Sequence, residues 1–288
     1  MILKEMEHKG IVPGQTFEDY KASDAVSHSD IKTFDVAPLK YLLYTGNDAP
    51  VKKSAVHLEL GTIIHKFILQ PELLETECLF LPEGVNLTHK KGRELKAEAE
   101  EKGLTLVRNN HAKIAAGVSR ALMDNKTYGP FFYDGKAEVS VYQRFGGLAC
   151  KGLIDWLPNT GGLFIDVKTV GRSCQPKAFF KQCEDLKYYR QFAMYRALLR
   201  LSGLSIKRVL CIVIETEPPY LMRMYEMPEQ LLLAGEDEAK RKVEAIQQCM
   251  ATQYWPGFDS EIIPCELPDV TPDWAYEKAG VKRRLLNR

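Results

Sequence analysis

The chain has 288 residues, of which 45% are hydrophobic and 27% are charged, and its formal net charge is +1. These proportions are those of an ordinary globular protein that is long enough to bury a substantial core. No run approaches the ~18 apolar residues of a membrane span, and the first residues lack the apolar segment of a secretory signal, so we expect a cytoplasmic protein that contacts no membrane.

The near balance of charges bears on the kind of partner. With 39 Lys and Arg against 38 Asp and Glu, a polyanion would have to be bound through a local basic surface rather than by the protein's overall charge. Each basic segment is also compatible with an ordinary solvated surface. The candidate segments are His89 to Arg93, Lys168 to Lys181 and Lys282 to Arg284.

The seven cysteines are scattered along the chain, and their spacing contains no Cys-x-x-Cys pair. Zinc and iron–sulfur sites need several cysteines at close spacing. We therefore expect reduced thiols without a metal.

Hydrophobic periodicity gives the elements in chain order. Residues 1–24 are expected to form an irregular N-terminal arm, and residues 25–288 a single domain. Helices are predicted at 29–45, 54–70, 88–101, 110–124, 188–202 and 228–253, and strands at 77–81, within 137–170, at 207–215 and at 220–227. The predicted fold class is α/β, with a mixed central sheet flanked by helices.

The first polar residue of interest in chain order is His65. It lies beside the apolar face of a predicted helix, which includes Ile64 and Ile68, and it follows the small residues Gly61 and Thr62. A neutral imidazole is a common metal ligand. A single helical histidine is also a common structural residue, so this position alone does not decide between the two roles.

Glu138 comes next, on the alternating segment from Ala137 to Phe145. Its carboxylate could join a cluster of acids on neighbouring strands. Exposed strand glutamates are also common without a function.

The segment from Leu148 to Lys168 predicts a β-hairpin that carries acids on both strands. Asp155 lies near the end of the first strand, and residues 158–162 are strong turn formers. Because side chains alternate along a strand, Asp166 and Lys168 point to one face and Val167 to the other. Carboxylates are the ligands that Mg²⁺ prefers, and a lysine beside them can orient water or stabilise charge on a phosphate. A solvated pair of charges is the structural alternative.

A helix follows in which Tyr188, Gln191 and Tyr195 are spaced i, i+3 and i+7, which places them on one stripe. Amide and hydroxyl side chains can contact phosphate or metal-bound water. A buried tyrosine pair with glutamine at its edge is the structural alternative.

Taken in order, the histidine, the glutamate, Gly-x-x-Asp, Asp-x-Lys and Tyr-x-x-Gln-x-x-x-Tyr resemble the PD-(D/E)xK nuclease superfamily. Within it, the chain is similar to the RecE-type group (exodeoxyribonuclease VIII), including the opening segments Val26 to Lys32 and Ala37 to Leu42. The resemblance covers roughly residues 25–200, and lambda exonuclease and the RecB nuclease domain are more distantly similar. The chain has Leu153 where the family often has arginine, which puts one DNA or structural contact in doubt.

The resemblance implies a site for Mg²⁺ or Mn²⁺. The implied metal ligands are His65, Asp155, Asp166 and the backbone carbonyl of Val167. The implied catalytic residues are Asp155, Asp166, Lys168, Gln191 and Tyr195, with Glu138 and Tyr188 as accessory residues.

The resemblance also implies an activity and partners. We expect a 5′-to-3′ exodeoxyribonuclease that acts on linear double-stranded DNA ends in a bacterial or phage-infected cell. It would leave 3′ single-stranded tails for recombination by a RecT-like single-strand annealing protein. The group implies a homo-oligomeric ring, expected to be a tetramer. The alternatives are a structure-selective or helicase-associated endonuclease of the same superfamily, a non-catalytic DNA-binding or partner-loading protein, and a metal-dependent phosphatase acting on small nucleotides.

Overall fold

The computed structural model describes residues 8–45 and 56–263. Met1–Pro256 is one compact unit, and Gly257–Arg288 is a second unit whose described residues, 257–263, contain no helix or strand. Among the helices of the described residues, none combines the length and the apolar character that a membrane crossing requires.

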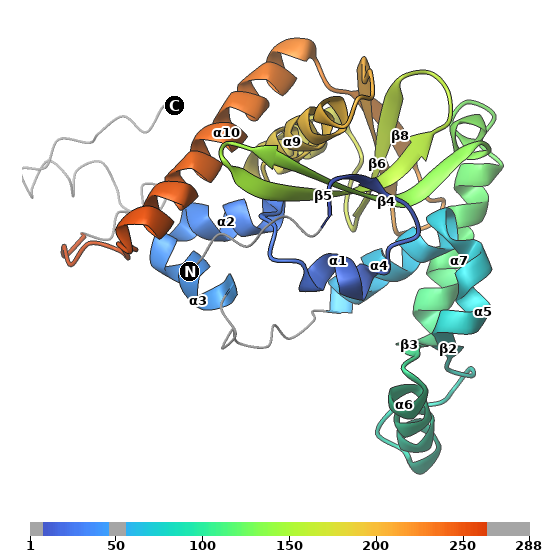
Figure 1. The fold of residues 1–288 in the computed structure, drawn as a ribbon. Coiled ribbons are helices and arrows are strands. Elements are labelled where there is room, and N and C mark those ends of the chain that lie inside the picture. The colour runs from blue at the N-terminus through green and yellow to red at the C-terminus, as the bar shows by residue number, and fades with distance from the viewer. Residues whose placement is uncertain (1–7, 46–55, 264–288) are drawn as a thin grey trace, which may run out of the picture. The chain divides into compact units, whose positions relative to one another are not determined.

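The elements of the first unit follow one another in chain order (Figure 1). Its strands are β1 (Gly10–Val12), β2 (Cys78–Phe80), β3 (Thr105–Val107), β4 (Gly135–Phe145), β5 (Leu148–Pro158), β6 (Leu163–Val170), β7 (Arg208–Glu215) and β8 (Met222–Glu226). Its longer helices are α1 (Phe17–Ala22), α2 (His28–Val36), α3 (Pro38–Thr45), α4 (Val56–Leu69), α6 (Lys90–Lys102), α7 (Asn109–Met123), α8 (Pro176–Asp185), α9 (Tyr188–Leu201) and α10 (Glu229–Thr252). Short helices are η1 (Pro71–Leu73), α5 (Leu74–Glu77) and η2 (Gly129–Phe132).

A six-stranded sheet forms the centre of this unit, in the order β1-β4-β5-β6-β7-β8. Only β6 and β7 run parallel, with α8 and α9 in the connection between them, and the other neighbours are antiparallel. A separate parallel pair joins β2 to β3. The predicted mixed α/β architecture is confirmed.

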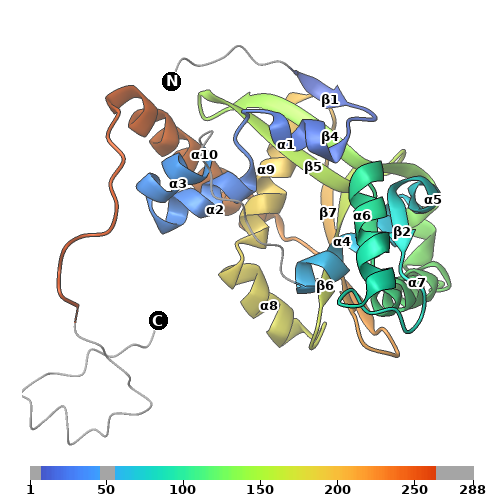
Figure 2. The ribbon, with the colours of Figure 1, turned by 90° about the horizontal axis from the view of Figure 1, so that it is seen from below.

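Helices cover both faces of the sheet, as Figure 2 shows. On one face α2, α9 and α10 pack over a large apolar cluster that includes Val141, Phe164 and Phe192. On the other face α4 and α7 pack over a second cluster that includes Ile165 and Ile212. Strand β7 is buried on both sides, as its apolar sequence predicts.

The N-terminal arm differs from the expectation of an irregular segment. Residues 10–12 form β1, which pairs with β4, and residues 17–22 form α1, which is capped by the Thr16 side chain. These elements are too short for their hydrophobic pattern to reveal them, and they are stabilised by tertiary contacts. Tyr20 of the arm and the adjoining Ala25 pack with Tyr142 on the sheet.

Candidate metal and active site

The candidate site lies where β5 and β6 separate. Trp156 pairs with Ile165, but the next available backbone N–H on β6, that of Val167, donates to the Asp155 carboxylate at 2.7 Å. The Asp155 side chain thus takes the place of the main-chain carbonyl that would accept this hydrogen bond in a regular β-ladder. Extending the Trp156–Ile165 register by one step places Asp155 opposite Asp166.

Strand β4 brings Glu138 to the same level. Glu138 lies between the pairs that join Ala137 to Trp156 and Val139 to Ile154, so it is opposite Asp155. Its φ of 47° is left-handed, and the regular alternation breaks there. Ala137 and Trp156 pack in the cluster under α4, whereas Val139 and Ile154 pack in the cluster under α9.

Helix α4 adds His65 to these acids. Its Nδ1 lies 3.8 Å from Asp155 Oδ2. His65, Glu138 and Asp155 each offer one potential ligand atom, and these atoms all lie within 4.8 Å of one another. Side chains from α4, β4 and β5, which are distant in the sequence, therefore converge on one point.

On β6, Asp166 and Lys168 point to the same face and form an ion pair, while Val167 packs in the opposite cluster. This is the alternation that the sequence predicts. Asp166 is only 1% exposed. The Lys168 ammonium lies 4.9 Å from the centroid of the Tyr188 ring and 5.6 Å from that of Phe192.

Helix α9 closes the site on the side of Asp166. Gln191 Nε2 donates to the Tyr195 hydroxyl at 3.0 Å. The Tyr195 ring lies against β5 at Gly152, where a Cβ atom would meet the ring Cδ1 at 2.8 Å. The structure thus brings Tyr188 to Lys168 and joins Gln191 to Tyr195. The expected roles of these residues, and of the Val167 carbonyl, stay predictions.

Leu153, the departure from the family pattern, lies on the other side of β5. It packs with Tyr20 and Tyr142 beneath the N-terminal arm. At this position the chain therefore makes an apolar packing contact.

Burial and mutual repulsion hold protons on the acids. Burial, followed by the charges of Asp155 and Asp166, raises the pKa of Glu138 to about 8. Burial, then the charge of Asp155, raises the pKa of Asp166 to about 7. The pKa of Asp155 is also raised, mainly by burial. The three carboxyl groups lie close together, and the positive charge near them is too small to stabilise all three in the ionised form.

The two basic groups behave in opposite ways. Burial, then the charge of Lys168, lowers the pKa of His65 to about 4, so its imidazole is neutral at physiological pH. Burial disfavours charge on Lys168, but Asp166 and Asp155 outweigh it and raise its pKa. The lysine is therefore a fixed positive charge, and the histidine is an available nitrogen ligand.

These residues fit a divalent cation. His65, Glu138 and Asp155 supply a neutral imidazole and two carboxylates whose ligand atoms lie within 4.8 Å of one another. This donor set suits Mg²⁺ or Mn²⁺. A cation in their midst would replace the protons that burial holds on the acids. His65, Glu138 and Asp155 are the side chains that would hold it. The expected contribution of Asp166, which forms an ion pair with Lys168, stays a prediction.

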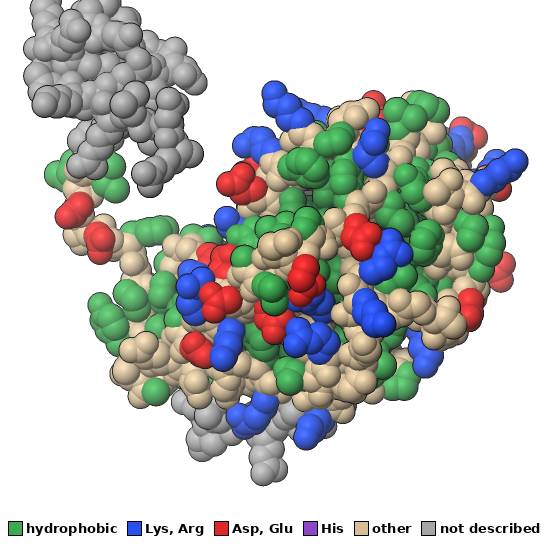
Figure 3. Space-filling view, turned by 90° about the horizontal axis from the view of Figure 1, so that it is seen from above, with side chains coloured by type: hydrophobic (Ala, Val, Ile, Leu, Met, Phe, Trp, Pro, Cys, Tyr) green, Lys and Arg blue, Asp and Glu red, His purple; other side chains and the backbone are tan. Residues whose placement is uncertain are grey.

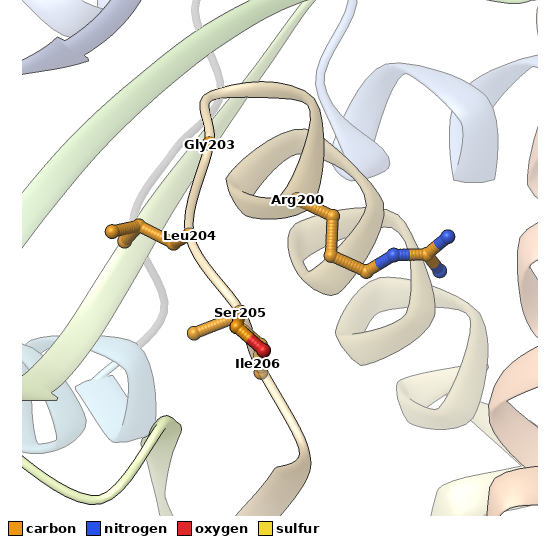
Figure 4. A pocket seen from close by; sticks show the side chains of 5 residues that line it. All are labelled: Arg200, Gly203, Leu204, Ser205 and Ile206. Atoms are coloured by element: carbon orange, nitrogen blue, oxygen red, sulfur yellow. The ribbon is translucent and has the colours of Figure 1, made fainter.

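A surface depression lies elsewhere, at the loop between α9 and β7 (Figure 4). Its lining contains no carboxylate, histidine or thiol, so it does not compete with the acid cluster as an active site. It is lined by Arg200, Gly203, Leu204, Ser205 and Ile206.

Comparison with known proteins identifies the family and the fold. Residues 27–267 match the family model described as "PDDEXK-like domain of unknown function (DUF3799)". The fold is similar to that of a "putative exonuclease" from Eubacterium rectale, with a TM-score of 0.60, 13% identity, and coverage of 89% of this chain and 97% of that chain. The structure of SSO0001 is less similar, with a TM-score of 0.29, 16% identity, and coverage of 66% of this chain and 86% of that chain. The comparison with curated proteins gave no match.

Proposed function

The chain belongs to the family of PDDEXK-like domains, and on this premise we propose that it is a divalent-metal-dependent deoxyribonuclease. The observation that carries the proposal is the convergence of Glu138, Asp155 and Asp166 from three adjacent strands, with Lys168 beside them. A buried acid cluster flanked by a fixed ammonium is suited to hydrolysis of a phosphodiester.

Each residue of the site would have a distinct role. A divalent cation bound there would act as a Lewis acid on a phosphate oxygen. Asp155 is oriented by the Val167 N–H. Lys168 would hold the attacking water or stabilise negative charge that develops on the phosphate. The aromatic rings of Tyr188 and Phe192 hold its ammonium in place.

Within this class we propose an exonuclease that degrades one strand of linear duplex DNA from 5′ to 3′. This finer assignment is supported by the order of motifs, which resembles that of the RecE-type group. The similarly folded Eubacterium rectale protein also carries the name of an exonuclease. The 3′ tails would serve recombination through a single-strand annealing protein of the RecT type, and a homotetrameric ring would keep the enzyme on its substrate. The setting would be the cytoplasm of a bacterial or phage-infected cell.

The test uses 5′-labelled and 3′-labelled linear duplex, with covalently closed circular duplex as the control, in Mg²⁺, in Mn²⁺ and in EDTA. The proposal expects progressive loss from the 5′ end of linear DNA in metal, with no cutting of the circle or in EDTA. Cutting of the circle would favour an endonuclease instead. Binding without cleavage in any metal would favour a non-catalytic DNA-binding protein.

Asp166→Asn is the matched variant for this test. It keeps the size of the side chain but removes a negative oxygen from the acid cluster, so cleavage should fall below detection while the circular dichroism spectrum is unchanged. Asp237→Asn is the control, because Asp237 is an exposed residue on α10 that pairs with Arg241 in its own helix. Normal cleavage by Asp166→Asn would show that the acid cluster is not the active site.

A further inference from the structure

Helix α2 is held at both of its ends, by β5 at its start and by α9 at its end. Val26, just before it, exchanges two backbone hydrogen bonds of 2.9 Å with β5, to Ala149 and from Lys151. Ser27 and Asp30 then form a capping box that begins the helix. At the other end, Asp35 forms an ion pair with the buried Arg190 of α9. The position of α2 relative to β5 and α9 is therefore well determined.

One face of α2 presents two nitrogen-bearing side chains. His28 and Lys32 are spaced i, i+4, so they are neighbours on the helix surface. His28 is 5% exposed, and its buried Nε2 has no hydrogen-bond partner among the described residues. The Lys32 residue is exposed. Neither residue was predicted as a site residue from the sequence.

Lys32 lacks a compensating acid in this part of the structure. Asp35, three residues away on the same helix, is already engaged by Arg190 and by Lys242, whose Nζ lies 2.9 Å from Asp35 Oδ1. Within residues 8–45 and 56–263, no ion pair includes Lys32.

The charges that act on this face are mostly positive. Although the residue as a whole is exposed, partial burial of the Lys32 ammonium, then the charges of Lys168 and Arg190, lowers its pKa. Burial lowers the pKa of His28 to about 3, with Arg190, Lys32 and Lys168 acting in the same direction against Asp35. The neutral His28 adds no charge of its own. Asp35, three residues beyond Lys32, contacts Arg190 near the start of α9. Arg190 is two residues beyond Tyr188, whose ring lies beside the Lys168 ammonium. Lys32 is therefore on the α2 side of the active-site lysine.

We propose that Lys32 binds a backbone phosphate of the DNA strand next to the scissile phosphate. Lys32 presents an exposed ammonium without an acid partner, on a helix fixed beside the active-site lysine. An ammonium in this position is suited to bind an anion such as a phosphate. Lys32 would position the strand, and Lys168 would act on the reacting phosphate. This inference rests on the proposed nuclease function.

The experiment measures binding of a fluorescent duplex in EDTA over a series of KCl concentrations. Loss of one phosphate contact should reduce the slope of log K against log [KCl] by about 1. We expect this reduction, with weaker binding, for Lys32→Ala, and its recovery in Lys32→Arg. Lys240→Ala is the control, because Lys240 is an exposed lysine on α10 that pairs with Glu244; its slope should equal that of the unmodified protein.

A second measurement locates the phosphate. Single methylphosphonate substitutions remove one backbone charge at a time near the cleaved end. At one position the substitution should weaken binding by the unmodified protein but cause no further loss in Lys32→Ala, which is the signature of a direct pair.

The outcomes separate the two proposals. If the unmodified protein cuts DNA and Lys32→Ala keeps its salt slope and its full methylphosphonate penalty at every position, the phosphate contact is wrong and the nuclease stands. If the unmodified protein neither binds nor cuts DNA, both are overturned.

Discussion

At the scale of single residues, the surroundings of Lys168 fix both the charge and the position of its ammonium. Its ammonium is held between Asp166 and the rings of Tyr188 and Phe192. It is therefore both charged and restricted in position. A lysine with this confinement can contribute to the transition state without losing much conformational freedom during the reaction.

Lys168→Met keeps the length of the side chain and removes its charge. We expect cleavage to fall by about 10²–10³-fold, the usual effect of losing one group that stabilises the transition state. Affinity for Mn²⁺, measured by calorimetry, should persist, because the acids and His65 remain. Lys240→Met should cleave normally. Loss of Mn²⁺ binding together with activity would instead assign Lys168 a structural role in holding the acids.

Glu138 gives a prediction about pH. Its pKa is about 8 in the folded protein, mainly because of burial and the neighbouring acids, against 4.5 for an unperturbed glutamate. Between these values the folded protein binds more protons than the unfolded chain, so the free energy of unfolding falls as pH rises through this window. Each unit of pKa difference corresponds to about 1.4 kcal/mol. In EDTA, Tm should decrease from pH 5 to pH 8.

Glu138→Gln should flatten that pH dependence, because the amide does not ionise. Glu94→Gln, at an exposed position on α6, should leave it unchanged. Adding Mn²⁺ should raise Tm most at the alkaline end of this range, because fewer protons compete there with the metal for the carboxylates. A Tm that rises from pH 5 to pH 8 in EDTA would contradict the account of the acid cluster.

At the scale of elements, the approach of α9 to β5 depends on Gly152. A Cβ atom at that position would lie 2.8 Å from the Tyr195 ring. Gly152→Ala should push the ring away, disturb the hydrogen bond from Gln191, and destabilise the fold by about 1–3 kcal/mol. Denaturant unfolding and single-turnover cleavage would measure both effects. Gly171→Ala is the control, since nothing lies within 4 Å of a Cβ atom there.

Local pattern was sufficient to predict most of these elements. The 3.6-residue period predicted α7, α9 and α10, and strand alternation placed Asp166 and Lys168 on one face. The strand β3 has three residues, too few for a recognisable pattern, and was not predicted; it pairs with β2. For residues 171–184 the sequence pattern allows a loop or a short helix, and the structure has the short helix α8 there.

The geometry of the site was harder to predict, because it depends on long-range pairing. Glu138 was a weak candidate from its type alone. Its place opposite Asp155 follows from the β4–β5 register and from a left-handed φ that no local pattern indicates. The approach of α2 likewise depends on two hydrogen bonds between Val26 and a strand more than 120 residues further along the chain.

At the scale of the whole molecule, the basic and acidic residues nearly balance, 39 against 38. On the face in Figure 3, basic and acidic side chains are interspersed with apolar ones. Net charge of +1 would steer DNA only weakly. A processive enzyme with such a surface would benefit from enclosing its substrate, which is consistent with the proposed ring.

Light scattering after size exclusion tests that assembly. A tetramer should elute with four times the chain mass of 32.7 kDa. Under the same conditions, processivity should be retained when competitor DNA is added after the enzyme has bound. A monomer that remains processive would refute the ring as its cause.

The pairing of Val26 with β5 also sets the limits of a foldable fragment. The family match begins at residue 27, but a chain cut there would leave the Ala149 carbonyl and the Lys151 N–H without their partners. It would also remove the carbonyls of Tyr20 and Ser23, each 2.7 Å from the buried Lys151 ammonium. Each orphaned buried group costs about 1–3 kcal/mol, and a charged one costs more. The smallest autonomous piece of this protein therefore begins upstream of its recognisable family sequence, and the arm is part of the folding unit.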